Sequence, residues 1–96
     1  MKKLTTIDQL RNLSEELHDS FKVKSLKVFG SFARGEESAA SDIDILVELS
    51  ETADLLDFIR LAEFLERRLG RKVDLVTERA LKAELRDGIM SEALSI

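Results

Sequence analysis

Two aspartates lie one residue apart where an apolar run of the sequence begins. Asp42 and Asp44 open the stretch "DIDILVEL", which continues to Leu49. Because side chains of a strand alternate between its two faces, both carboxylates point one way while Ile43 and the apolar residues after it point the other way. This pattern predicts a polar site on one face of a sheet whose opposite face is buried.

A third acid has a similar setting in the run "KVDLV", from Lys72 to Val76. Strand alternation places Asp74 on the face opposite to Val73 and Leu75. If this strand neighbours the one that carries Asp44, three carboxylates converge on the open face of the sheet.

Such a convergence is unfavourable unless a cation offsets it. Two carboxylates about 5 Å apart repel each other by roughly 3 kcal/mol at an effective dielectric constant of about 20. A divalent cation between the acids would remove the repulsion, and oxygen ligands favour Mg²⁺ or Mn²⁺. The alternative is a set of solvated acids on an exposed face, which suits Asp42 at a strand end better than Asp44 or Asp74 within apolar runs. The chain has no cysteine and one histidine, His18, which leaves no thiol or histidine-rich metal site.

The pair Gly30-Ser31 directly follows another apolar run. Glycine lets the backbone approach a ligand closely, and the serine hydroxyl adds a hydrogen-bond donor. No Gly-Lys-Ser/Thr follows, so this is not a P-loop. A Gly-Ser pair by itself is more often an ordinary turn, and its spacing to the acids is what makes it a candidate binding element.

Two further residues have weaker interpretations. Arg34 could contact a phosphate, or it could bridge to a nearby acid such as Glu36. His18 is expected on the polar side of the first helix, as a surface residue without a chemical role.

Apolar residues at spacings of three and four predict three helices, over about residues 7–20, 55–69 and 78–94. Thr6 with Gln9 forms a capping-box pattern at the start of the first helix. Gly70 is placed as the residue after the second helix, and Thr77 can cap the third.

Strands are expected at Ser25–Phe29, Ile43–Leu49 and Lys72–Val76. The element order is then αββαβα. We expect an α+β fold of two layers, with a small mixed sheet and helices packed on one face. At 96 residues, the chain is expected to form a single domain over residues 1–96.

Composition excludes several classes of function. The net charge of −4 and a pI of about 5.0 argue against a protein that wraps nucleic acid, because phosphate binding requires clustered Lys and Arg. No apolar run reaches about 18 residues, so we expect no membrane span. The opening "MKKLTTIDQL" lacks the apolar stretch of a signal peptide, and we expect a cytoplasmic protein.

The segment "FGSFARGEESAASDIDILV" strongly resembles the signature of the minimal nucleotidyltransferases, members of the DNA polymerase beta superfamily. The run "VDLV" is similar to the strand that carries the third acid of that family. The resemblance covers nearly the whole chain and implies a polymerase beta-like catalytic core.

The resemblance implies a role for each candidate residue. Gly30 and Ser31 would receive the triphosphate of ATP or another NTP. Asp42 and Asp44 would be ligands of two Mg²⁺ ions, and Asp74 would complete the metal site and activate the attacking hydroxyl. The implied reaction is attack of an oxygen nucleophile on the α-phosphorus of the nucleotide, with pyrophosphate as the leaving group.

The resemblance also suggests a partner. Small stand-alone members of the family commonly act as antitoxins of helical HEPN-type ribonuclease toxins, and some transfer AMP to a tyrosine of the toxin. We therefore expect an antitoxin that modifies such a partner. Two alternatives stay open: a non-catalytic module that neutralises its partner by contact, and a small-molecule nucleotidyltransferase whose site is completed in a homo-oligomer.

Overall fold

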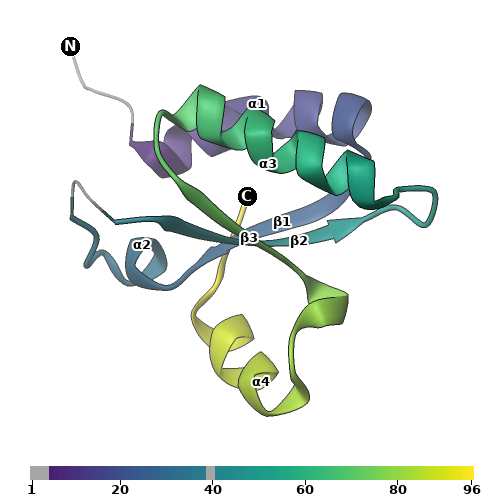
Figure 1. Cartoon of the computed structure of the whole chain (residues 1–96). Coiled ribbons are helices and arrows are strands. Elements are labelled where there is room, and N and C mark those ends of the chain that lie inside the picture. Colours follow the sequence, from purple (N-terminus) through teal and green to yellow (C-terminus); the bar gives the residue numbers. More distant parts are fainter. Residues whose placement is uncertain (1–4, 39–40) are drawn as a thin grey trace.

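The computed structural model describes residues 5–38 and 41–96, and a four-stranded mixed sheet lies at its centre (Figure 1). The strands are β1 (Val23–Phe29), β2 (Ile43–Leu49), β3 (Val73–Thr77) and β4 (Leu94–Ser95). Their order across the sheet is β3-β2-β1-β4. β2 runs parallel to β3, while β1 is antiparallel to both β2 and β4. The second and third strands are therefore neighbours, which is the condition on which the convergence of their acids depended.

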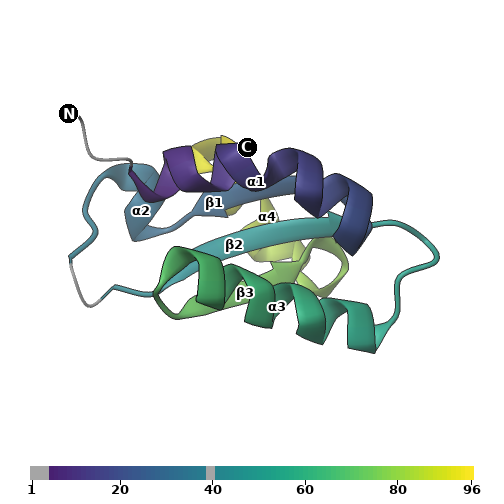
Figure 2. The ribbon, with the colours of Figure 1, turned by 90° about the horizontal axis from the view of Figure 1, so that it is seen from above.

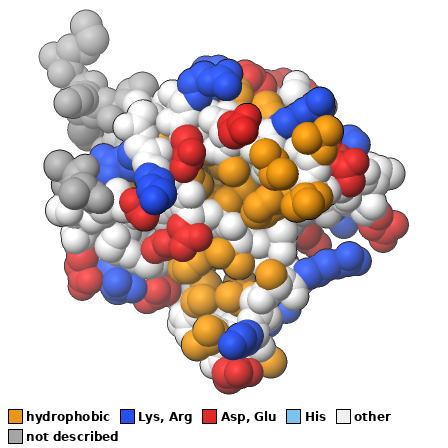
Figure 3. Space-filling view, viewed as in Figure 1, with side chains coloured by type: hydrophobic (Ala, Val, Ile, Leu, Met, Phe, Trp, Pro, Cys, Tyr) orange, Lys and Arg blue, Asp and Glu red, His pale blue; other side chains and the backbone are white. Residues whose placement is uncertain are grey.

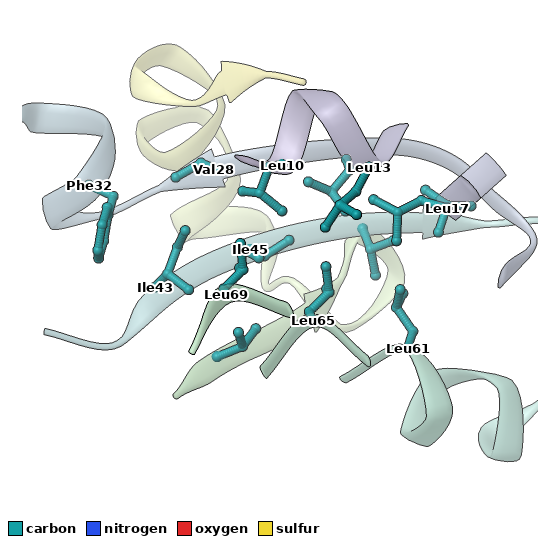
Figure 4. Packing of buried hydrophobic residues seen from close by; sticks show 14 residues of the cluster. Leu10, Leu13, Leu17, Val28, Phe32, Ile43, Ile45, Leu61, Leu65 and Leu69 are labelled. Carbon is teal, nitrogen blue, oxygen red and sulfur yellow. The ribbon is translucent and has the colours of Figure 1, made fainter. Parts of the chain in front are cut away.

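Two helices, α1 (Thr6–Phe21) and α3 (Leu55–Leu69), cover one face of the sheet, as Figures 1 and 2 show. The core fills the space between these helices and the sheet. Figure 4 shows side chains from both helices meeting those from the strands, among them Leu10, Leu65 and Ile45, which are fully buried. The two-layer packing expected from the sequence is present, but a further helix, α4 (Ala83–Glu92), lies on the other side of the sheet.

The two long helices, α1 and α3, each begin with a capping box. In α3, the side chain of Asp54 accepts a hydrogen bond from the backbone of Asp57, and the Asp57 side chain accepts one from the backbone of Asp54. In α1, the same arrangement joins Thr5 and Asp8, so the predicted pair Thr6 and Gln9 was wrong by one residue. An aspartate in the first turn adds a favourable interaction with the helix dipole, which a glutamine amide does not provide.

Gly70 ends α3 in the left-handed conformation, as predicted. At the end of α1, Lys22 adopts that conformation instead, with φ of 58°, and β1 follows directly at Val23. His18 donates from Nδ1 to the carbonyl oxygen of Val23 at 2.9 Å when that nitrogen carries the proton. This close junction lets β1 begin two residues before the predicted Ser25.

The predicted loop after β1 contains a short helix, α2 (Ser31–Arg34), which the sequence patterns did not indicate. Four residues are too few to show helical periodicity. Gly35 ends α2, with the backbone N–H of Glu36 donating to the carbonyl oxygen of Ser31 at 2.9 Å. Residues 39–40 of the predicted loop lie outside the described residues.

The single helix predicted over residues 78–94 was wrong. Thr77 does act as a cap, but of one 3₁₀ turn, η1 (Glu78–Ala80), and α4 begins only at Ala83. The chain then leaves α4 and pairs with β1 through β4, where the backbone N–H of Ile96 donates to Leu26 at 3.0 Å. The free edge of β1 offers backbone hydrogen bonds, and the Ile96 side chain packs against the core.

Several large apolar side chains stay on the surface. Figure 3 shows hydrophobic groups on the face turned to the viewer, in the regions of α3 and α4. Leu55 at the start of α3 is 73% exposed, and Leu85 of α4 is 54% exposed. Across residues 5–38 and 41–96, no helix has the length and apolar character needed to cross a membrane.

Candidate functional site

The site is built around Asp44, which faces Asp74 across the parallel strands. The two residues are direct partners in the register of β2 and β3. Adjacent strands lie about 4.8 Å apart, so both side chains leave the sheet side by side on the same face. This is the face opposite to α1 and α3, because Ile43 and Ile45 of β2 belong to the core between helices and sheet. The structure brings together two of the three predicted acids.

Gly30 closes the other side of Asp44. Phe29, the last residue of β1, pairs with Asp44, and Gly30 follows with φ of 72° and ψ of −149°. A Cβ atom added at Gly30 would overlap the Asp44 carboxylate oxygen Oδ2 and would lie 3.1 Å from its Cγ. Glycine is therefore required twice, for its backbone conformation and for the room that it leaves to the carboxylate.

Ser31 comes next and is the first residue of α2. Its side chain is half-buried, and the turn that holds it is closed by the N–H of Arg34, which donates to the carbonyl oxygen of Gly30 at 3.2 Å. The predicted pair Gly30 and Ser31 thus lies beside the predicted acid Asp44.

The electrostatics of Asp44 reflect this crowding. Partial burial raises the pKa of its carboxyl, and the neighbouring Asp74 raises the pKa further, through both charge repulsion and a shared hydrogen bond. Asp42 adds a smaller effect of the same sign, whereas the guanidinium of Arg34 acts in the opposite direction. A cation placed here would reverse the unfavourable balance, because it favours the charged carboxylate.

Asp42 itself precedes β2 and is exposed. In the described parts of the chain, no three Asp, Glu or His side chains are grouped so that they could hold a metal ion. The donor chemistry at Asp44 and Asp74 suits Mg²⁺ or Mn²⁺, since both side chains supply oxygen ligands. The ligand set of three acids is not preformed, and the metal role of the acids stays a prediction.

Arg34 forms ion pairs with two glutamates. Its guanidinium lies 3.0 Å from Glu36 and 3.1 Å from Glu92 at the end of α4. The bridge to Glu36 that the sequence suggested is therefore present. All three side chains are substantially exposed, and such pairs contribute little to stability. Figure 3 shows acidic and basic side chains mixed on the left of the molecule, the side on which α2 lies in Figure 1.

Sequence reasoning missed Arg71, which contacts two parts of the site. Its Nη1 donates to the carbonyl oxygen of Ser41 at 3.0 Å, and its guanidinium carbon lies 4.8 Å from the centre of the Phe32 ring. The only signal in the sequence was its place three residues before Asp74, and no spacing rule attaches a function to that position.

A cavity of about 640 Å³ opens at the opposite end of β2 and β3. Its lining includes Leu49, Phe58, Thr77 and Arg86, and none of the predicted site residues. The carboxylate site is therefore an open surface of the sheet and is distinct from this cavity.

Comparisons with known proteins show the family to which the chain is similar. The family model described as "Nucleotidyltransferase domain" matches residues 10–96. A protein of Methanocaldococcus jannaschii named "Putative protein adenylyltransferase" is 49% identical over 82 residues, which is 84% of this chain and 95% of that protein. The protein adenylyltransferase MntA of Thermococcus cleftensis is 37% identical and covers 97% of this chain and 98% of its own length.

Solved structures have the same fold. A structure described as a "putative minimal nucleotidyltransferase" is 40% identical, with a TM-score of 0.84, and covers 95% of this chain and 93% of that chain. A toxin–antitoxin structure with AMP-PNP gives 29% identity, a TM-score of 0.74 and coverage of 96% and 72%. A tri-AMPylated HEPN toxin of Shewanella oneidensis in complex with an MNT antitoxin gives 25% identity, a TM-score of 0.68 and coverage of 95% and 71%.

Proposed function

This chain belongs to the family of nucleotidyltransferase domains, and we propose that it transfers AMP from ATP to a tyrosine hydroxyl of a helical HEPN-type toxin. The observation that carries the proposal is the placement of Asp44 between Gly30 and Asp74 at one end of the sheet. A nucleotide-binding turn and paired carboxylates at one place are what the transfer of a nucleotidyl group requires.

The proposed reaction is an in-line displacement at the α-phosphorus. The hydroxyl oxygen of the acceptor forms a bond to that phosphorus, and the bond from phosphorus to the bridging oxygen of pyrophosphate breaks. Asp74 accepts the proton of the hydroxyl, while Gly30 and Ser31 hold the triphosphate through backbone and hydroxyl donors. Asp42 and Asp44, together with Asp74, would hold two Mg²⁺ ions, or Mn²⁺ in their place. When bound, such ions supply charge neutralisation at the phosphates and stabilise the attacking and leaving oxygens.

The choice of donor and acceptor rests on relatives. The Thermococcus cleftensis protein is named a protein adenylyltransferase, and the Shewanella oneidensis structure holds an AMPylated HEPN toxin. An ATP analogue, AMP-PNP, is part of another similar structure. We propose by analogy that ATP is the donor, that a toxin of this kind is the partner, and that the protein acts as its antitoxin in the cytoplasm.

The acceptor can be tested cleanly, because this sequence contains no tyrosine. Any AMP-tyrosine formed in a mixture with the partner must therefore come from the partner. The experiment incubates the protein with ATP labelled at the α-phosphate, Mg²⁺ and a candidate HEPN-type toxin from the same genome, followed by mass spectrometry of both chains. We expect AMP on a toxin tyrosine and loss of toxin activity.

The control is the double variant Asp42→Asn with Asp44→Asn, which should still associate with the toxin but leave it unlabelled. Binding and silencing of the toxin by the wild type with no change in mass would contradict the proposal and favour a non-catalytic module. Label that appears only in a small molecule would instead indicate a small-molecule nucleotidyltransferase.

A further inference from the structure

Arg71 lies where three segments of the site meet. It directly precedes Lys72, whose carbonyl oxygen accepts a hydrogen bond from the N–H of Ile43 at 3.0 Å, and it stands three residues before Asp74. Its side chain is half-buried and extends away from β3 towards the turn after β1 and the start of β2. Arg71 thus directly precedes a residue that is hydrogen-bonded to the start of β2, while its side chain reaches the other two segments.

The first segment that Arg71 contacts is α2, through Phe32. The guanidinium stacks over the ring at 4.8 Å from its centre, and Phe32 is only 7% exposed. Figure 4 shows Phe32 at the end of the core cluster nearest Ile43. Because Phe32 directly follows Ser31, a fixed ring fixes the residue that presents the predicted triphosphate-binding hydroxyl.

The second segment is the entry to β2, through Ser41. Arg71 Nη1 donates to the carbonyl oxygen of Ser41 at 3.0 Å. The Ser41 hydroxyl accepts a hydrogen bond from the N–H of Ser38 at 2.8 Å, so this residue is held from both sides. Ser41 precedes Asp42, the predicted acid that does not belong to a strand and has no register partner in the sheet.

We propose that Arg71 is a positioning residue, which holds Ser31 and Asp42 in place relative to Asp74. Only arginine combines the two contacts, because a planar guanidinium can stack on a ring and donate in its own plane, whereas the ammonium of lysine cannot. Its contacts are to protein groups of the turn and the loop. Arg71 therefore acts through Ser31 and Asp42 and is not expected to touch the nucleotide. This inference rests on the proposed function of those residues.

The test compares Arg71→Ala, Arg71→Lys and the matched control Arg67→Ala, which removes the same charge from an exposed position on α3. The Kd for Mn²⁺ is obtained by fitting the rise in melting temperature against Mn²⁺ concentration. The Kd for AMP-PNP with Mn²⁺, and the kcat and KM for AMP transfer to the toxin, are measured at 25 °C. A melting curve without ligand shows whether each variant is folded at that temperature.

We expect Arg71→Ala to raise the Kd for Mn²⁺ and the Kd for AMP-PNP about tenfold each. A misplacement of about 1 Å in a site can lower a rate about a hundredfold, and we expect kcat to fall by at least tenfold. Arg71→Lys keeps the charge but should recover only a small part of the loss, and Arg67→Ala should stay within twofold of the wild type.

The outcomes separate this inference from the proposed function. If the wild type and a folded Arg71→Ala variant bind Mn²⁺ and AMP-PNP equally well, Arg71 is not a positioning residue. The proposed function would be unaffected by that result. Full recovery by Arg71→Lys also overturns the role of Arg71, because charge and not geometry would then matter. A wild type that binds neither Mn²⁺ nor AMP-PNP overturns the proposed function and this inference with it.

Discussion

The charged carboxylate of Asp44 is unfavourable in the folded protein, because it is partly buried and lies beside Asp74. The carboxyl lies close to the backbone of Gly30, and both the burial and the neighbouring Asp74 disfavour its charge. A sequence selected only for stability would place a neutral residue at this position of β2, because the charge lies beside Asp74. The cost is understandable if the protein uses the carboxylate to bind a cation and a nucleotide.

Gly30 is the residue whose substitution tests this crowding. In Gly30→Ala, the new methyl group would overlap the Asp44 carboxylate, and alanine would have to adopt a φ of 72°. We expect AMP transfer to fall at least a hundredfold, because the carboxylate must turn away from Asp74. The left-handed backbone should also lower the free energy of unfolding by about 1–3 kcal/mol, measured by urea denaturation.

Gly35→Ala is the control, since Gly35 has the same φ of 72° but nothing within 4 Å of an added Cβ. This variant should lose about 1–2 kcal/mol of stability and keep AMP transfer within threefold of the wild type. Equal losses of activity in both variants would show that backbone strain matters and that the contact with Asp44 does not.

At the scale of elements, the site depends on which strands are neighbours. β2 lies between β1 and β3, so the turn after β1 and the acid of β3 reach Asp44 from opposite sides. Alternation within "DIDILVEL" and "KVDLV" predicted the face of each acid, whereas the order of the strands came only from the structure. The sequence also predicted the bounds of β2 and α3, whose apolar patterns are long and end at clear signals such as Gly70.

Other elements depend on contacts that no local pattern contains. β4 forms because the edge of β1 is free to accept it, which cannot be inferred from the two residues Leu94 and Ser95. The helical spacing of Leu81, Leu85 and Ile89 suggested a longer helix, yet α4 has no buried residue to fix it. For the same reason Arg71 was missed, since its partners Phe32 and Ser41 lie about 30 residues or more away.

The capping box of α3 gives a prediction about pH. The backbone N–H of Asp54, and then the Lys22 ammonium 3.2 Å away, lower the pKa of the Asp57 carboxyl. A carboxyl whose pKa is lower in the folded state adds stability above its unfolded pKa, about 3.9, and loses it as the pH falls through the folded value. Asp57→Asn should therefore melt at a lower temperature than the wild type at pH 7.

This difference in melting temperature should narrow as the pH falls below about 4, where Asp57 of the unfolded chain takes up a proton, and should close further as the folded chain is protonated at lower pH. Glu63→Gln, an exposed substitution on the same helix, is the control and should show little difference at either pH. If the difference in melting temperature between Asp57→Asn and the wild type stays constant down to pH 2.5, the charge of the Asp57 carboxylate does not stabilise the folded protein.

In the molecule as a whole, folding and cation binding are coupled through the paired acids. The acids repel one another in the folded chain, where β2 and β3 hold Asp44 and Asp74 side by side, and they can separate in the unfolded chain. A cation that binds only the folded state adds RT ln(1 + [L]/Kd) to the free energy of unfolding. The stability of the molecule should therefore respond to the metal, and the response should depend on Asp44.

Metal binding by the paired acids is tested by the melting temperature of the protein with and without millimolar Mn²⁺. At a hundred times the Kd, the metal adds about 2.7 kcal/mol, which raises the melting temperature of a domain of this size by about 10 °C or more. We predict such a rise for the wild type and for the control Asp19→Asn, at an exposed acid of α1, and its near loss in Asp44→Asn and Asp74→Asn. An equal rise in Asp44→Asn would place the metal elsewhere and contradict the account.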